Sequence, residues 1–232
     1  MLQIRGSDER GFADHGWLKA KHSFSFADYY DPSNMGFRGL RVMNEDRIDA
    51  AQGFGTHPHR DMEIITVILK GALEHKDSMG TGSVIKPGDV QYMSAGSGVL
   101  HSEFNHSKEE SAHLYQIWIL PNERGAKPRY AQTHFTREHK LNKLCLVASP
   151  DGREGSIAIR ANAKLYSSIL DPGKDLSYRP EQNRGQWVQI IRGELSVNGK
   201  TVREGDGVSI WDVSEIELKP IAETEILLFD LE

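Results

Sequence analysis

The chain has little of several features that would place it in a specialised class of protein. It has one cysteine, Cys145, among 232 residues, so no internal disulfide can form and a reducing, cytoplasmic location is expected. No run of about 18 apolar residues occurs, so we expect no transmembrane helix and no membrane partner. Segment 1–17 is charged and lacks an apolar stretch, which argues against a signal peptide.

Excess positive charge is also missing. Lys and Arg number 28 against 33 Asp and Glu, which gives a net charge of -5 at pH 7. A protein that binds nucleic acid directly usually carries a basic face, so we expect no direct nucleic-acid partner. No pattern indicates an oligomer, and a monomer is expected.

Long helical periodicity is absent as well, and short apolar runs alternate with turns instead. The chain has 22 glycines, and this spacing predicts an all-β sandwich or barrel. Asn198-Gly199 between β-branched residues predicts a hairpin with a type I′ turn. One short helix is expected within 135–143. The expected strands cover 39–43, 62–69, 90–93, 114–120, 144–147, 187–191, 194–197, 207–211 and 225–229.

The two halves of the chain share a rhythm of strand, glycine, strand and Gly-Asp. The first half has Gly71 and then Gly88-Asp89, and the second half has Gly193 and then Gly205-Asp206. The spacing suggests a degenerate repeat of one barrel, although Gly-Asp turns are common in any β protein. The polar stretch 121–128 is expected in or just before the linker, which divides the chain into domains 1–130 and 131–232.

Four polar side chains form two pairs with the same spacing. One residue separates His57 from His59, and one separates His101 from Glu103. Alternate side chains of a strand point to the same face, about 6 to 7 Å apart, so each pair presents two groups on one face. The interior of a barrel is a place where two such faces converge.

Together these residues offer three imidazoles and one carboxylate. This set suits Fe, Mn, Co, Ni, Cu or Zn rather than Ca or Mg. Four protein ligands leave one or two positions open on a five- or six-coordinate ion, which is a catalytic arrangement. The alternative is a hydrogen-bonded polar core without a metal, but burying such a cluster without a cation would be costly.

The motifs around these pairs resemble the two cupin motifs as they occur in pirins. They are His57-Pro58-His59-Arg60 followed by Glu63, and the segment 93–105 that contains His101-Ser102-Glu103. The resemblance is dense over the first 130 residues and weaker from there to the end. Further segments that resemble pirins are 15–18, 22–27, 30–32, 74–78 and 114–118.

The resemblance implies a bicupin of two β-barrel (jelly-roll) domains with one metal site in the N-terminal barrel. Its ligands would be His57, His59, His101 and Glu103. Fe(II) is the first choice for the metal, with Zn, Ni, Co, Mn or Cu as alternatives. Glu63 occupies a position that is a ligand in many other cupins, and we leave it outside the ligand set. No histidine follows His139, so the C-terminal barrel is expected to be metal-free.

Bacterial pirin-like proteins resemble quercetin 2,3-dioxygenases, which open a flavonol ring with O2 and release carbon monoxide. The resemblance therefore implies a flavonol and O2 as substrates, with Glu103 as the base for the flavonol 3-hydroxyl. Gln116 is a candidate to orient a ligand. Phe54, Met43 and Tyr92 are candidates for the pocket wall, with a plain core role as the alternative.

Two other functions stay open at this point. Some pirins resemble iron-dependent cofactors of transcription, so the site could instead be a redox sensor that binds a protein partner. Another cupin chemistry, such as isomerisation or hydrolysis, is a third alternative, because the fold alone does not decide the reaction.

Overall fold

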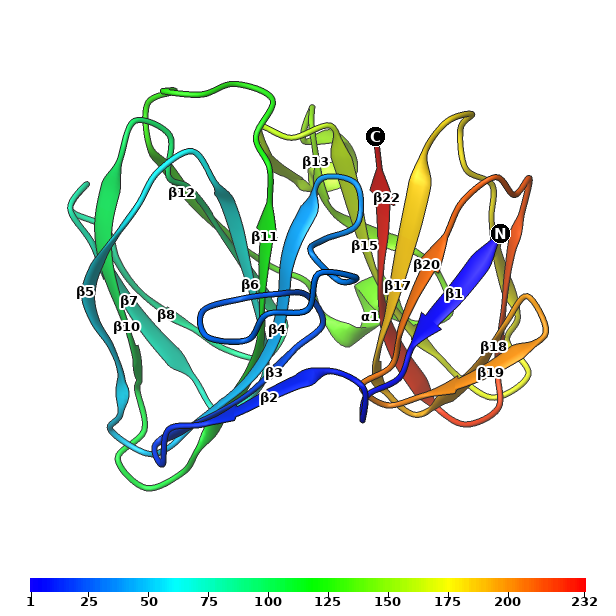
Figure 1. Cartoon of the computed structure of the whole chain (residues 1–232), viewed down its shortest axis with the longest axis horizontal. Coiled ribbons are helices and arrows are strands. Elements are labelled where there is room, and N and C mark those ends of the chain that lie inside the picture. Colours follow the sequence, from blue (N-terminus) through cyan, green and yellow to red (C-terminus); the bar gives the residue numbers. More distant parts are fainter. The chain divides into compact units, whose positions relative to one another are not determined.

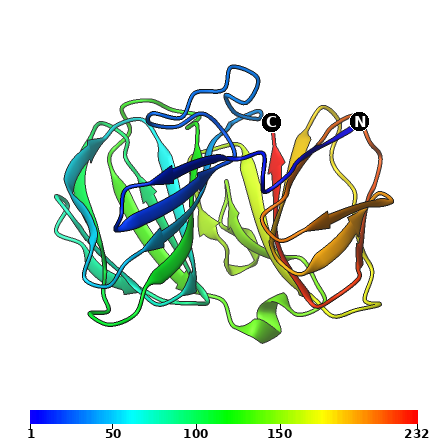
Figure 2. The same cartoon turned by 60° about the horizontal axis from the view of Figure 1, so that its bottom comes forward.

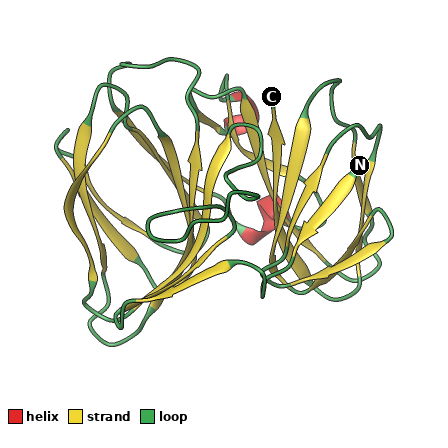
Figure 3. Ribbon diagram, viewed as in Figure 1, coloured by secondary structure: helices red, strands yellow, loops and turns green.

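The computed structural model describes all residues from 1 to 232. Nearly all of the regular secondary structure is strand, joined by loops and turns (Figure 3), which confirms the all-β prediction. It divides into two compact units. The unit that we call the first barrel is Gly11–His134 with Ile159–Ala161, and the second barrel is Met1–Arg10, Phe135–Ala158 and Asn162–Glu232. No helix has the length and apolar character needed to cross a membrane.

The first barrel consists of a seven-stranded sheet and a four-stranded sheet. The larger has the order β12-β9-β6-β11-β4-β3-β2, and the smaller has the order β5-β10-β7-β8. The strands are β2 (Gly11–Asp14), β3 (Leu18–His22), β4 (Leu40–Ile48), β5 (Gly53–His59), β6 (Glu63–Lys70), β7 (Leu73–Asp77), β8 (Gly82–Ile85), β9 (Asp89–Ser94), β10 (Val99–Asn105), β11 (Ala112–Ile119) and β12 (Arg129–His134).

The second barrel repeats this plan. Its seven-stranded sheet has the order β1-β20-β17-β22-β15-β13-β14, and its four-stranded sheet has the order β16-β21-β18-β19. The strands are β1 (Leu2–Arg5), β13 (Cys145–Ser149), β14 (Ile157–Ala158), β15 (Ala163–Leu170), β16 (Leu176–Tyr178), β17 (Gly185–Arg192), β18 (Glu194–Val197), β19 (Lys200–Arg203), β20 (Gly207–Ile210), β21 (Ile216–Pro220) and β22 (Thr224–Leu231).

The repeated glycines occupy equivalent turns in the two barrels. Gly71 and Gly193 join β6 to β7 and β17 to β18, with φ of 76° and 87°. Gly88 and Gly205 precede β9 and β20 with φ of 95° and 84°, and such positive φ values favour glycine. The shared strand order and turns confirm the predicted repeat.

Two local predictions are also confirmed. Asn198 and Gly199 both have positive φ, 46° and 80°, as a type I′ turn requires, and they join β18 to β19. The short helix α1 (Arg137–Lys140) lies inside the expected range 135–143. Figure 2 shows it in light green in the connection between β12 and β13.

The division into units differs from the expected boundary after residue 130 at both ends of the chain. Strand β12 pairs antiparallel with β9 from Arg129↔Ser94 to His134↔Asp89, so the first barrel continues to His134. Strand β1 pairs with β20 from Leu2 to Arg5, which puts the N-terminus in the second barrel (Figure 1). Each of these strands occupies the equivalent edge of its own larger sheet.

The interior of the second barrel is filled with apolar side chains. Twelve buried residues form its core, among them Val188, Leu195, Ile216 and Leu218, all fully buried. The first barrel instead has two smaller apolar clusters, one around Ile68 and Leu114 and the other around Ile64 and Met93. The difference leaves room inside the first barrel for polar groups.

Candidate metal centre

Strands β5 and β10 bring the two predicted pairs together. His101 lies directly opposite His57 in the antiparallel register, while Glu103 lies opposite Phe54. The register shifts between these two pairs, so β5 has one more residue here than β10, as in a β-bulge. The extra residue allows Phe54, His57 and His59 all to face the interior, which strict alternation would not permit.

The three imidazoles lie close to one another. Ring centroids are 4.8 Å apart for His57 and His59, 4.4 Å for His57 and His101, and 4.8 Å for His59 and His101. Each offers a ring nitrogen, and these atoms lie within 4.8 Å of one another. These three histidines can therefore hold a metal ion. Glu103, the fourth predicted ligand, is grouped instead with His101 and with His75 of β7, so the four-ligand set stays a prediction. We call His57, His59, His101 and Glu103 together the polar cluster.

Burial keeps the imidazoles of His59 and His101 neutral near pH 7. Burial, followed by the nearby His57, lowers the pKa of His59 to about 4. Burial, followed by the neighbouring histidines, lowers the pKa of His101 to about 2. His57 Nδ1 donates to the backbone oxygen of Gly55 at 2.8 Å, which leaves its Nε2 with a lone pair. Neutral imidazoles with free lone pairs are the form that binds metals.

Glu103 is held from the opposite sheet by Gln116. The Gln116 amide donates to Glu103 Oε2 at 2.8 Å, and Trp118 Nε1 donates to Gln116 Oε1 at 3.2 Å. Because an indole can only donate, this second bond fixes which end of the amide faces the carboxylate. Burial raises the pKa of Glu103 to about 7, and the bond from Gln116 partly opposes that rise. The prediction that Gln116 orients a ligand stays a prediction, with this contact in its favour.

Two buried atoms of the cluster have no hydrogen-bond partner. They are His101 Nε2 and Glu103 Oε1, on side chains that are 1% and 2% exposed. Unsatisfied buried groups of this kind are rare and costly. Nitrogen and oxygen donors of this type suit a transition metal, so the residues present fit a transition-metal ion.

A row of polar side chains crosses the interior of the larger sheet at this level. Directly paired residues share one face, and the pairing runs without a break from β3 to β9. The row separates the two apolar clusters, because Ile64 and Ile68 of β6 lie on either side of it. Its members are His22, Asn44, Gln116, Thr66 and Gln91.

A cavity of about 510 Å³ adjoins the cluster, within the usual range for small-molecule sites. Its wall includes His57, His59 and Glu103 together with Phe54 and Trp118. The sequence suggested Phe54 as a pocket residue, and the structure places it there. Because the cavity opens onto the polar cluster, a bound molecule would contact both at once.

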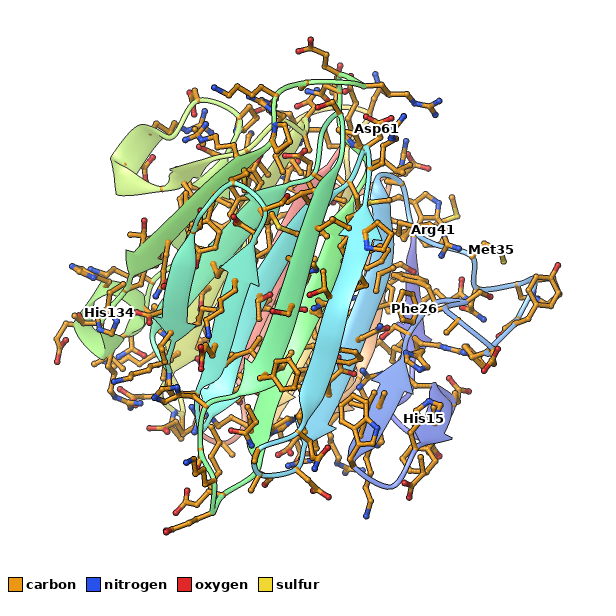
Figure 4. All side chains as sticks on the ribbon, turned by 90° about the vertical axis from the view of Figure 1, so that its left-hand side faces the viewer. His15, Phe26, Met35, Arg41, Asp61 and His134 are labelled. Atoms are coloured by element: carbon orange, nitrogen blue, oxygen red, sulfur yellow. The ribbon has the colours of Figure 1, made fainter.

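Aromatic side chains form one wall of the cavity. The Trp118 ring lies edge-on to His59 at 4.9 Å and to Phe26 at 5.3 Å between centroids. The His22 and Tyr29 rings stack at 6.2 Å, and all of these residues line the cavity. Figure 4 shows Phe26 and His15, another lining residue, on the same side of the barrel.

The loop 23–39, which contributes Phe26 to that wall, is held by its own hydrogen bonds. Ser25 Oγ donates to the Asp31 backbone oxygen at 2.9 Å and accepts from the Asp31 amide at 2.8 Å. The Asn34 amide donates to Asp31 Oδ2 at 2.7 Å, and the Arg41 guanidinium donates to the Ser25 backbone oxygen at 2.8 Å. The wall is therefore preorganised before a ligand enters.

The remaining residues that the sequence singled out lie elsewhere. Glu63 accepts from the Tyr92 hydroxyl, from Ser94 Oγ at 2.7 Å and from the Arg160 amide at 3.1 Å. Both of its oxygens are thus occupied in a network apart from the histidines. Tyr92 and Met43 are fully buried and do not line the cavity, so their alternative role in the core is the one observed.

Sequence reasoning missed two residues beside the cluster. His75 and Asp77 of β7 are both fully buried, and the His75 ring lies 5.2 Å from that of His101. Their His-x-Asp spacing is the same as that of the two predicted pairs, and this was the signal available in the sequence. His22 and Asn44 were also missed as cavity residues, because only strand pairing brings them to the wall.

Comparison with known proteins agrees with this fold. Residues 4–119 match the family described as Pirin, and residues 146–231 match the quercetinase C-terminal cupin domain. The chain is 46% identical to quercetin 2,3-dioxygenase of Escherichia coli K12, over 100% of this chain and 99% of that protein. It is 38% identical to a pirin-like protein of Caulobacter vibrioides, over 99% of each.

A solved structure is also similar over the whole chain. It is the crystal structure of the bacterial pirin YhhW from Escherichia coli in complex with nickel(II), with a TM-score of 0.96 and 46% identity. The alignment covers 100% of this chain and 99% of that one. Fold and cluster thus define a bicupin whose first barrel can hold a metal ion. The chain belongs to the pirin family.

Proposed function

We propose that this protein is a metal-dependent dioxygenase that opens the ring of a flavonol, such as quercetin, with O2 and releases carbon monoxide. The observation that carries the proposal is the contact between the cavity and the polar cluster, with His57, His59 and Glu103 forming part of the cavity wall. The relative named quercetin 2,3-dioxygenase, at 46% identity over the whole chain, supports the same reaction.

The metal would be held by His57, His59, His101 and Glu103, with Fe(II) as our first choice. The nickel(II) complex of the E. coli relative shows that a divalent ion other than Fe(II) can occupy a protein of this kind. When bound, the metal would acidify the substrate hydroxyl that it contacts and would permit electron transfer to O2.

Proton transfer and orientation of the substrate would be carried out by side chains of the protein. Glu103 would act as metal ligand and as base in turn: it faces the cavity with one unpartnered oxygen, Oε1, which can accept the proton of a flavonol 3-hydroxyl. Burial raises the pKa of Glu103 to about 7 in the metal-free protein, and a bound cation would favour the ionised form that accepts the proton. Gln116, fixed by Trp118, would keep the carboxylate facing the substrate.

The aromatic wall suits a planar substrate. Phe26, Trp118 and Phe54 present apolar surface to the cavity, while His22 and Asn44 add polar groups. A flavonol has this mixed character, since its fused rings are flat and its edges carry hydroxyls. The same wall would exclude bulk water from the reacting atoms.

The test is quercetin turnover by protein reconstituted anaerobically with Fe(II), followed after O2 is admitted. We expect loss of the flavonol absorbance with a matching amount of carbon monoxide. Glu103→Gln, which keeps the shape but cannot take up a proton in the same way, should lower turnover. His134→Gln alters an exposed histidine of the same barrel and should not change turnover.

The alternative function is that of an iron-dependent redox sensor that binds a protein partner in transcription regulation. It predicts full metal loading without carbon monoxide release. That result would contradict the dioxygenase proposal, and a partner whose affinity changes between the ferrous and ferric protein would then be sought.

A further inference from the structure

A buried chain of hydrogen bonds lies behind the cluster, on strand β7. His75 Nε2 lies 3.0 Å from Asp77 Oδ2, and His75 Nδ1 lies 3.4 Å from His101 Nδ1. His75 and Asp77 have no exposed side-chain surface. This series of hydrogen bonds ends at Nδ1 of His101, on the opposite side of the ring from the unpartnered Nε2.

The chemistry of each group sets the direction of these bonds. An ionised carboxylate only accepts, so His75 Nε2 must carry the proton that it donates to Asp77. A neutral imidazole has one protonated nitrogen, and His75 has no exposed side-chain surface, where an imidazolium would be costly to desolvate. Its Nδ1 is therefore an acceptor, and His101 Nδ1 must donate to it. The His101 lone pair is then left on Nε2.

Asp77 is itself held in place. Its Oδ1 accepts from the backbone amides of Met79 at 2.9 Å and Thr81 at 3.0 Å, in the turn between β7 and β8. The His75 ring packs on Tyr130 at 4.9 Å with an interplanar angle of 30°. Neither Asp77 nor His75 can rotate without losing these contacts, so the fold fixes the direction of the hydrogen bonds from His101 to His75 and from His75 to Asp77.

We propose that Asp77 and His75 are positioning residues that fix His101 as the Nδ1–H tautomer and so present its Nε2 lone pair to the metal. The inference rests on the proposed function and deepens it. Histidine ligands commonly donate their second ring N–H to a carboxylate or carbonyl, and here a second imidazole stands between the ligand and the carboxylate.

The same bonds determine which metal position the barrel favours. His75, His101 and Glu103 also lie close enough to form a three-residue metal group. An ion bound there through His75 Nδ1 and His101 Nδ1 would displace the hydrogen bond between them. Because Asp77 holds His75, the chain of bonds favours the position between His57, His59 and His101.

Asp77→Asn is the sharpest test. The asparagine oxygen would stay with the amides of Met79 and Thr81, so its NH2 group would face His75 and donate to it. That donation reverses each bond of the chain and places the proton of His101 on Nε2. We expect Ni(II) affinity, measured by chelator competition, to fall by about 10- to 100-fold, as for other changes behind a metal ligand.

His75 offers a matched pair of variants. Glutamine can donate to Asp77 through its NH2 group and accept from His101 through its oxygen, so His75→Gln should keep Ni(II) affinity within about threefold of wild type. His75→Phe keeps a ring on Tyr130 but neither hydrogen bond, so it should weaken binding by about 10- to 100-fold.

Asp89→Asn is the control substitution. Asp89, the first residue of β9, accepts from His134 Nδ1 at 2.7 Å and from the Lys86 amide at 2.9 Å, so it is also a mostly buried carboxylate that holds a histidine. Figure 4 shows His134 on the opposite side of the barrel from His15 and Phe26. This variant should bind Ni(II) like wild type.

The decisive readout is the tautomer of His101 in the metal-free protein, from long-range ¹⁵N–¹H NMR. We expect Nδ1–H in wild type and Nε2–H in Asp77→Asn. An Nε2–H wild type, or Asp77→Asn and His75→Phe proteins that bind Ni(II) as tightly as wild type, would overturn the inference. If wild type binds no Ni(II), the proposed function fails, and the tautomer alone then decides whether the chain of bonds has the inferred direction.

Discussion

The two barrels share one strand order and equivalent glycine turns, yet their interiors are opposite in character. In the smaller sheet of the first barrel, β5, β10 and β7 carry His57, His101 and His75. The corresponding strands of the second barrel, β21 and β18, carry Ile216 and Leu195 in its apolar core, and β16 carries Tyr178, which packs against that core. The fold is therefore stable with either content, and the polar cluster is an addition that folding does not require.

The largest expected effect comes from removing a proposed ligand. His101→Ala or Glu103→Ala should remove most bound metal, weakening affinity by more than the roughly 100-fold upper range for residues behind a ligand. Because the second barrel shows that this fold needs no such residues, the variants should stay folded. Metal analysis and circular dichroism check both points, and full metal occupancy in both variants would show that the ligand set is wrong.

Leu218→Ala makes the reverse change in the other barrel. Leu218 is fully buried in the apolar core, so truncation should cost about 2–5 kcal/mol of unfolding free energy. Urea unfolding would measure the loss, and Ni(II) affinity of the folded protein should stay the same. A large drop in affinity would show that the two barrels are energetically coupled at the site.

Metal binding to the polar interior of the first barrel should release a proton, whereas the apolar interior of the second barrel has no such group. Glu103, whose pKa burial raises to about 7, is mostly protonated at about pH 6 in the metal-free protein, and a metal must displace that proton. His59 and His101, whose pKa burial lowers to about 4 and about 2, are already neutral and release none. Metal affinity should therefore fall about tenfold per pH unit below pH 7. Calorimetry in two buffers should show that Glu103 releases about one proton when the metal binds at about pH 6. A Glu103→Gln protein should release about one proton fewer than wild type, and equal wild-type affinity at about pH 6 and pH 8 would contradict the assignment.

The smallest expected effect concerns the support of Glu103. Trp118→Phe keeps an aromatic ring beside His59 but loses the indole donor to Gln116. One such hydrogen bond contributes about 1 kcal/mol, so quercetin turnover should fall by about fivefold with metal content unchanged. Equal turnover in the variant would mean that Gln116 is held by other contacts.

The sequence was sufficient to predict the two barrels and the place of the cluster. The two pairs, His57-x-His59 and His101-x-Glu103, were found from the two-residue period of regular strands. The repeat was found from the spacing of glycines, and these glycines mark turns with positive φ, which is a local property of the chain. These signals are local, and that is why they could be interpreted without the structure.

Other features depend on pairing between distant segments. The bulge in β5 beside Gly55, the row from His22 to Gln91, and the place of β1 beside β20 follow from register, which no short motif encodes. His75 and Asp77 have the same spacing as the predicted pairs, but only the pairing of β7 with β10 brings them to His101.

The central claim is that the first barrel holds one metal ion through four side chains. Anomalous diffraction from crystals of protein loaded with Fe(II) or Ni(II) tests it most directly. The account predicts one peak in the first barrel, in contact with His57, His59, Nε2 of His101 and the Glu103 carboxylate. A peak between His75 and His101, or no peak in the first barrel of metal-loaded protein, would contradict it.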